Sequence, residues 1–355
     1  MEQRWDEIEG GIHSCSSLTQ LRSLREDFHR SFDASLALKE PEDAVKRTNE
    51  IHDALIAKAV SFAEPHVSKE MSYNPLAGFS VLLFGSGGRR EQSMWSDQDN
   101  GLVYEALPYF DQDKVQTYVA KLGETIQACL EAVGYPPCEG GVIVGQPLWR
   151  RSLAEWEETF KQWADESSFE SIRHLLVAAD ARSVSGDGRI ALQFTASYLT
   201  LVRQRPQLVH RMLQNTLRHK VLIGVLGNLL TEPYGEDAGG IDIKYGAYIP
   251  MVNAVRLLAL HHRIAETSTL ERIRALSRDG QVEKADAERW EEAFLTVLRL
   301  REMLPHQLAN GMYTTRGKLS AAMLTKEVKR ELRQALRIGA ELQQHVKKTI
   351  VRRGG

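Results

Sequence analysis

Two carboxylates, Asp97 and Asp99, follow a glycine-rich segment that opens with Gly85 and Ser86. The short apolar run before Gly85 predicts a buried strand, and glycine lets the turn after it bring backbone N–H groups close to phosphate. On a following strand, alternate positions place both carboxylates on one face. There they offer the oxygen ligands that a hard divalent cation prefers. The spacing therefore indicates chemistry on a nucleoside triphosphate.

Nucleotidyl transfer needs a held triphosphate, neutralised charge and an acceptor aligned with the α-phosphorus. Two metal ions held by carboxylates commonly meet these needs, so Asp97 and Asp99 are the predicted catalytic residues and ligands of Mg²⁺ or Mn²⁺. A helix starting near Gly87 would point its N-terminus at the phosphates, and an arginine beside it would add a charged donor. The predicted nucleotide-binding residues of this segment are Gly85, Ser86, Gly88 and Arg89.

The glycine turn and the Asp-x-Asp pair are each common, usually as a plain turn and a surface feature. Their combination, with ten residues between Ser86 and Asp97, is a narrower pattern and favours the functional interpretation. The neighbouring Arg90 and Glu91 remain open: they pair on the surface, or Glu91 caps and orients the loop.

The bulk composition narrows the class of protein. The chain has 355 residues, 43% hydrophobic and 26% charged, with a formal net charge of −2, which suits a globular protein of two or three domains and gives no strong nucleic-acid signal. Its three cysteines show no metal or disulfide spacing. No apolar run reaches membrane-spanning length and the first residues are polar, so we expect a cytoplasmic protein without a membrane partner.

Three parts are expected along the chain. Apolar residues at helical spacing predict an N-terminal helical region over residues 1–70. Strands alternating with helices predict an α+β domain over 71–200. Amphipathic stripes then predict an all-helical domain over 201–355, in which Ser268 and Glu271 form a capping box.

Within the central part, short apolar runs and turn residues predict the strands, and helical periodicity predicts the helices between them. The segment 174–181 fits either a strand or a helix. Strands are expected at 79–84, 97–104 and 141–145, and helices at 113–133 and 152–163.

The Gly-Ser and Asp-x-Asp arrangement resembles the polymerase-β nucleotidyltransferase superfamily. The fuller string from Gly85 to Asn100 is similar, more narrowly, to nucleotidyltransferases related to the N-terminal domain of the PII-uridylyltransferases. The resemblance runs from about Asn74 to the C-terminus and continues through residues 140–142, 147–150, 180–187, 241–244 and 254–260. It implies a mixed sheet with helices, an associated C-terminal helical domain, and a role in signal transduction.

The activity implied by the resemblance is uridylyltransferase-like. A nucleoside monophosphate passes from NTP to a protein or small-molecule acceptor, with release of pyrophosphate. Gly85 and Ser86 match the phosphate loop of the family, and Asp97 and Asp99 match its metal ligands.

The third carboxylate of the superfamily is less clear. Glu139, which precedes a plausible strand, is the predicted third metal ligand, and its alternative role is that of an exposed loop residue. Asp180 is a second candidate, although an ion pair with Arg182 is the role expected of it. Without a third ligand, the protein is instead a non-catalytic nucleotide-sensing signalling module.

Three polar residues stand in the apolar C-terminal region: Asp242, Lys244 and Arg256. Salt bridges between helices are the favoured role, and Lys244 is the best candidate for binding nucleotide. Which NTP is used, what accepts the nucleotide and whether the chain forms a homo-oligomer are left open.

Overall fold

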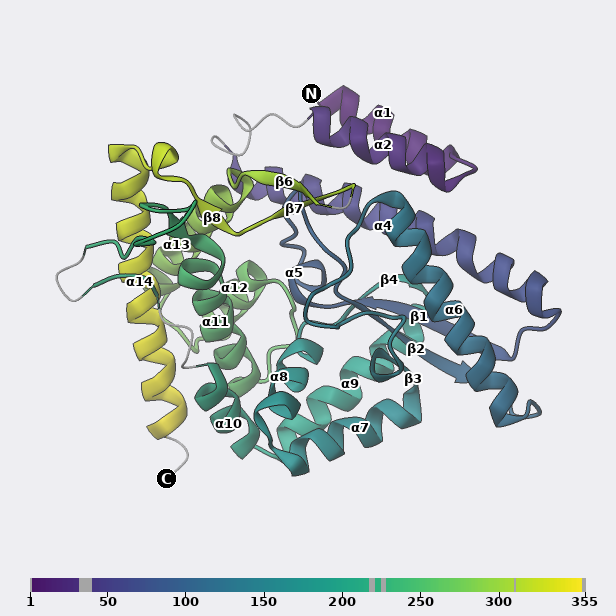
Figure 1. The fold of residues 1–355 in the computed structure, drawn as a ribbon. Coiled ribbons are helices and arrows are strands. Elements are labelled where there is room, and N and C mark those ends of the chain that lie inside the picture. The colour runs from purple at the N-terminus through teal and green to yellow at the C-terminus, as the bar shows by residue number, and fades with distance from the viewer. Residues whose placement is uncertain (1, 32–39, 217–220, 225–227, 310, 353–355) are drawn as a thin grey trace.

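A small β-sheet lies between an N-terminal group of helices and a larger C-terminal helical group in the computed structural model (Figure 1). The structure describes residues 2–31, 40–216, 221–224, 228–309 and 311–352. The fold class is α+β with helical termini, as predicted.

The sheet has four strands in the order β3-β2-β1-β4. Its central strand β1 (Leu76–Leu83) is antiparallel to both β2 (Asn100–Ala106) and β4 (Arg182–Gly186), and β3 (Arg150–Ser152) lies parallel to β2. Strand β1 lies between β2 and β4, and the glycine turn begins directly after its C-terminal end.

Both faces of β1 are buried in its C-terminal half, residues 80–83, which explains the apolar run before the glycine turn. Alternate residues point to opposite faces: Val81 and Leu83 belong to one core, and Leu82 and Phe84 belong to the other. The first core is formed with helices α1 (Glu2–Ser14), α2 (Leu18–Ser31), α4 (Pro41–Met71) and α6 (Gln112–Val133). The second is formed with α7 (Leu153–Glu166), α8 (Phe169–Ala178), α9 (Gly188–Gln204) and the C-terminal helices.

Helix predictions in the central part are confirmed. Helix α6 covers the predicted 113–133, and α7 begins at Leu153, after the N-cap Ser152, which forms a reciprocal capping box with Glu155. The ambiguous segment 174–181 is helical through Ala178, the end of α8, before β4 begins at Arg182.

One strand prediction is wrong. Residues 141–145 form no strand. Asn100, and not a paired strand, makes hydrogen bonds to their backbone. Val144 N donates to Asn100 Oδ1 at 2.8 Å, and Asn100 N donates to the Val142 carbonyl at 3.1 Å. The third strand of the sheet is β3.

The C-terminal group is built from long helices joined by short strands and turns. Its helices are α10 (Gln207–Thr216), α11 (Ile249–His261), α12 (Thr269–Arg278), α13 (Lys284–Glu302) and α14 (Lys326–Arg352). A π-helical turn, η2 (Lys244–Tyr248), leads into α11. Two strand pairs complete it, β5 (Ile241–Asp242) with β8 (Lys318–Leu319) and β6 (His306–Ala309) with β7 (Met312–Thr315).

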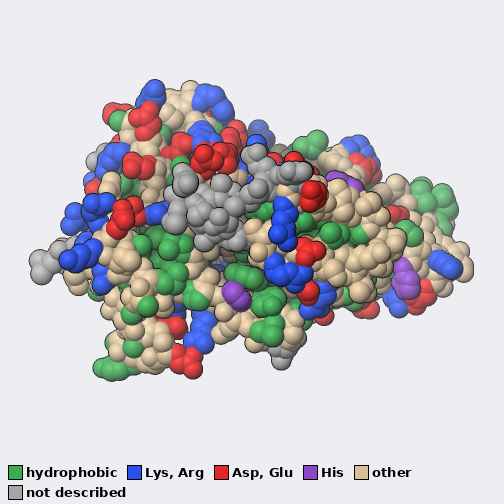
Figure 2. Space-filling view, turned by 90° about the horizontal axis from the view of Figure 1, so that it is seen from above, with side chains coloured by type: hydrophobic (Ala, Val, Ile, Leu, Met, Phe, Trp, Pro, Cys, Tyr) green, Lys and Arg blue, Asp and Glu red, His purple; other side chains and the backbone are tan. Residues whose placement is uncertain are grey.

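The division at residues 70 and 200 stays a prediction. Helix α4 runs to Met71 and α9 to Gln204. Among the described residues, every helix falls short of the length or the apolar character that crossing a membrane requires. Figure 2 shows basic and acidic side chains interspersed over one face, in keeping with the small net charge.

Candidate active site

The glycine turn sits directly against Asp99. After β1 the chain forms a single helical turn, α5 (Gly85–Gly88), and Phe84 N donates to the Asp99 carbonyl at 2.8 Å. Gly85 has a φ of +53°, and a Cβ atom there would collide with the Asp99 carboxylate. The position therefore requires glycine both for its backbone conformation and for the close approach of the aspartate.

The two aspartates lie just before β2 rather than on it, so the strand predicted at 97–104 begins three residues too early and ends two residues too early. The segment is still extended and alternating. Gln98 is 3% exposed, with its N and Nε2 donating to the carbonyls of Pro136 and Tyr135, while Asp97 and Asp99 are half-buried.

A small pocket brings the predicted residues together. Ser86, Gly87, Asp97 and Asp99 all line it. The structure thus joins the turn and the carboxylate pair in one place, which is the geometric core of the sequence hypothesis.

The aspartate pair carries more negative charge than its surroundings neutralise. Burial first, and then the neighbouring charge of Asp97, raise the pKa of Asp99 to about 7. Burial also raises the pKa of Asp97, and Glu139 adds to this rise. Lys244 opposes both shifts. Two hard oxygen donors whose mutual repulsion a cation would relieve fit Mg²⁺ or Mn²⁺.

The third ligand is not evident from the geometry. Glu139 is exposed, though close enough for its charge to raise the pKa of Asp97. Among the residues that the structure describes, no three or more His, Cys, Asp and Glu side chains are grouped so as to hold a metal ion. The role of Glu139 as a ligand stays a prediction.

Sequence reasoning missed Cys138. Its thiol lies near Asp99, and burial followed by the Asp99 charge raise the pKa of the thiol to about 12. Cys138 therefore keeps its proton beside the aspartate pair at neutral pH. No spacing rule for cysteines signals such a contact.

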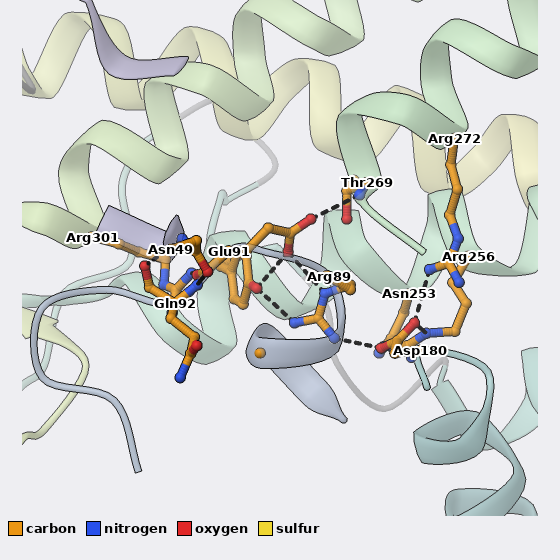
Figure 3. A network of polar contacts seen from close by, with 12 residues as sticks. Asn49, Arg89, Glu91, Gln92, Asp180, Asn253, Arg256, Thr269, Arg272 and Arg301 are labelled. Carbon is orange, nitrogen blue, oxygen red and sulfur yellow. Dashed lines mark hydrogen bonds and ion pairs between the residues drawn. The ribbon is translucent and has the colours of Figure 1, made fainter. Parts of the chain in front are cut away.

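Arg89 does not line the pocket and belongs instead to a network of polar contacts (Figure 3). It is 2% exposed, and all three guanidinium nitrogens are engaged: Nε with Glu91 Oε2 at 2.8 Å, Nη1 with Asp180 Oδ2 at 2.5 Å and Nη2 with Tyr248 Oη at 2.6 Å. Because all three of its nitrogens are held and it is buried, this guanidinium is fixed within the network, so the geometry favours a structural role over the predicted nucleotide contact.

Asp180 is the centre of the same buried network. Its carboxylate receives Arg89, Arg256 Nε at 3.0 Å and Arg272 Nη1 at 2.9 Å. Burial alone would raise its pKa, but the three arginines hold the pKa well below its usual range. Asp180 does not pair with Arg182 as expected, nor does it line the pocket of Asp97 and Asp99.

Gly88 also belongs to this structural region. A Cβ atom at Gly88 would collide with the Asp180 carbonyl, so glycine permits the turn to pack on the Asp180 backbone. This explains the residue without a phosphate contact, and its nucleotide-binding role stays a prediction.

Glu91 joins the turn to the C-terminal helices. Its Oε1 accepts from Thr269 N at 2.8 Å, at the first residue of α12, and its Oε2 accepts from Tyr248 Oη at 2.6 Å. Ser268 makes no capping hydrogen bond, so the predicted Ser268–Glu271 box is wrong. The Glu91 carboxylate takes that place, and a negative charge at a helix N-terminus is stabilising.

Lys244 and Arg301 are C-terminal residues whose charges act on the aspartates, Lys244 on both and Arg301 on Asp97. Lys244 is exposed at the start of η2, and its charge lowers the pKa values of Asp97 and Asp99. Asp242 instead accepts from Tyr245 N at 2.7 Å, and Arg256 pairs with Asp180. Of the three polar residues singled out, only Lys244 is placed to meet an anionic ligand at the pocket.

The fold combines a mixed sheet, which carries the glycine turn and the paired aspartates, with a group of C-terminal helices. This is the arrangement expected of a nucleotidyltransferase with an accessory domain. Residues 31–170 match a family model described as "Putative nucleotidyltransferase DUF294", and residues 206–350 match one described as "Putative nucleotidyltransferase substrate binding domain". The matches span most of the chain, which belongs to this nucleotidyltransferase family. A search of curated proteins found no match.

Proposed function

We propose that this protein is a metal-dependent nucleotidyltransferase that moves a nucleoside monophosphate from NTP to a hydroxyl of a protein or small molecule, as uridylyltransferases do. The carrying observation is that the Gly85–Ser86 turn lies against Asp99, in one pocket with Asp97. In the reaction the acceptor oxygen bonds to the α-phosphorus, the bond from that phosphorus to the bridging oxygen breaks, and pyrophosphate leaves.

Each residue at the pocket has a distinct task. Gly85 and Ser86 would hold phosphate through backbone N–H groups and the serine hydroxyl. Asp97 and Asp99 would hold Mg²⁺ or Mn²⁺, and a bound ion of this kind neutralises phosphate charge and stabilises the attacking and leaving oxygens. Lys244 would supply a positive charge from the C-terminal domain.

A labelling experiment tests the proposal. The protein is incubated with each α-labelled NTP and Mg²⁺ or Mn²⁺, beside the Asp97→Asn/Asp99→Asn double variant. Asp113→Asn, an exposed aspartate of α6, is the matched control. We expect pyrophosphate release and label transfer in the wild type and the control and neither in the double variant. Intact-protein mass reports whether the chain itself is the acceptor.

The competing function is nucleotide sensing without transfer. The absence of a three-residue metal cluster among the described residues is the observation that favours it. Nucleotide binding without turnover, with every NTP and a panel of acceptor proteins and small molecules, would replace the proposal with this function. No nucleotide binding at all would overturn both.

A further inference from the structure

One face of the N-terminal helix α4 contacts the segment that carries the proposed catalytic residues. Asn49, His52 and Asp53 are spaced so that they share one side of the helix. Their side chains contact, directly or through one residue, the stretch from Gly85 to Asp99.

Asn49 holds the main chain of Gln92 from both sides. Its Oδ1 accepts from Gln92 N at 2.9 Å, and its Nδ2 donates to the Gln92 carbonyl at 3.1 Å and to the Val45 carbonyl at 2.8 Å. Asn49 is 1% exposed, and Figure 3 shows it facing Gln92. A single side-chain amide thus forms hydrogen bonds with both the N–H and the carbonyl of Gln92, which lies in an irregular buried loop. Buried without partners, these two backbone groups would cost free energy.

His52 holds the next residue and reaches toward the aspartates. Burial lowers its pKa to about 3, so the ring is neutral. Its Nε2 lies 3.1 Å from the Ser93 carbonyl, which only accepts, so Nε2 carries the proton and Nδ1 accepts from Tyr135 Oη at 2.7 Å. The Tyr135 carbonyl in turn accepts from Nε2 of Gln98, the residue between the two aspartates.

Asp53 acts on the glycine turn through Arg182. Both carboxylate oxygens of Asp53 accept from Arg182, each at 2.8 Å, in the bidentate geometry that fixes a guanidinium most firmly. Arg182 Nη2 also donates to the Gly87 carbonyl at 2.7 Å. One helix therefore holds the turn at Gly87, the loop at Gln92 and Ser93, and the support beneath Gln98.

We propose that Asn49, His52 and Asp53 are positioning residues, and that α4 sets the distance between the glycine turn and the aspartate pair. The inference rests on the proposed function for its purpose. It does not rest on turnover for its test, because the order of the loop and its affinity for a cation can be measured without an acceptor.

The test compares Asn49→Leu with Thr48→Val. Leucine is close to asparagine in size but cannot hold the Gln92 backbone. Thr48 is the buried neighbour on the same helix, and its hydroxyl has no hydrogen-bond partner among the described residues, so valine is a matched control. Hydrogen–deuterium exchange is followed over residues 85–99, and Mn²⁺ affinity is measured by electron paramagnetic resonance.

For Asn49→Leu we expect faster exchange at Gln92 and through the loop to Asp99, with β1 and α11 protected as in the wild type. Mn²⁺ binding should weaken about 10-fold, as is typical when support behind a metal ligand is removed. Thr48→Val should change neither. Unchanged exchange and affinity in Asn49→Leu would overturn the inference.

A second variant keeps the inference testable if Asn49→Leu does not fold. Asp53→Asn releases Arg182 and should speed exchange in residues 85–89, with a similar loss of Mn²⁺ affinity. If neither measurement differs from the wild type, the inference is overturned. A wild type that binds no Mn²⁺ contradicts the proposed function instead, and the exchange data alone then decide the role of α4.

Discussion

The carboxylate of Asp180 and the carboxylate pair of Asp97 and Asp99 lie in opposite electrostatic environments. Asp180 is 0% exposed and meets three arginines, which hold its pKa well below the usual range. Asp97 and Asp99 are half-buried beside each other, and their pKa values are raised. The protein itself neutralises Asp180, whereas a bound cation would lower the raised pKa values of Asp97 and Asp99.

The contrast separates a structural carboxylate from the pair that is proposed to be functional. An ion pair saturated by its own protein holds elements together, and the arginines at Asp180 come from the turn, from α11 and from α12. Carboxylates left without such partners cost free energy in the folded state, and perturbed pKa values of this kind gather at functional sites. Substitutions at the two groups should therefore act on different quantities.

The largest effect is expected on stability at Asp180. Asp180→Asn leaves the buried Arg256 and Arg272 without their counter-charge and Arg89 with Glu91 alone. Breaking a buried pair in this way should lower the free energy of unfolding by about 3–5 kcal/mol. Urea denaturation at pH 7 measures the loss. Asp99→Asn, the same chemical change at the other group, is the control and should not destabilise the metal-free protein. Equal losses in the two variants would contradict the comparison.

Cation affinity should show the reverse. Asp99→Asn removes a proposed ligand and should weaken Mn²⁺ binding by at least about 100-fold, more than loss of a supporting residue usually does. Calorimetric titration measures the affinity. The exposed Asp113→Asn should bind Mn²⁺ like the wild type. A variant of Asp99 that keeps its affinity would show that the pair is not a metal site.

The pH dependence of stability sharpens the comparison further. The folded pKa of Asp99, about 7, lies above its unfolded value near 3.8, so its contribution makes the metal-free protein less stable as pH rises from about 4 to 7. Asp180 has the opposite sign: its pKa is lowered on folding, so its contribution is complete above the unfolded value and is lost as pH falls below about 4. Urea midpoints between pH 3 and 8 measure both limbs.

The control for this profile is Asp99→Asn, which should make the decline between pH 4 and 7 shallower and leave the acid limb intact. Part of the decline should remain, because the pKa of Asp97 is also raised and burial raises the pKa of Glu302 to about 7. Saturating Mg²⁺ should likewise make the decline shallower in the wild type, because a bound cation favours the ionised carboxylate. A decline that is unchanged in Asp99→Asn would contradict the assignment to Asp99, and Glu302 is then the group to substitute.

Local patterns in the sequence predicted the glycine turn, the aspartate pair and the long helices. Helical periodicity located α6 and α7, because it is decided within a few turns of helix. The need for glycine at Gly85 also shows locally, since few other residues allow its φ of +53°.

Residues with distant partners could not be placed from the sequence. Arg89 next to a glycine turn resembles a phosphate ligand until Asp180 and Tyr248, far along the chain, occupy its guanidinium. Ser268 resembles a helix cap until Glu91 arrives at Thr269 N. Nothing in the sequence indicated the role of Asn49. A polar residue of an amphipathic helix that contacts a buried loop cannot be distinguished by sequence from one that faces solvent.

The smallest expected effect concerns Lys244, which brings a positive charge from the C-terminal helices toward Asp97 and Asp99. Because Lys244 is exposed, Lys244→Gln should weaken NTP binding only by about 3–10-fold, and the loss should shrink as salt rises. Lys318→Gln is the matched control, since Lys318 lies nearby on β8 but pairs with Glu232. Fluorescent-nucleotide titration at low and high salt measures the difference. A loss equal in both variants, or independent of salt, would mean that Lys244 acts through the fold and not through its charge.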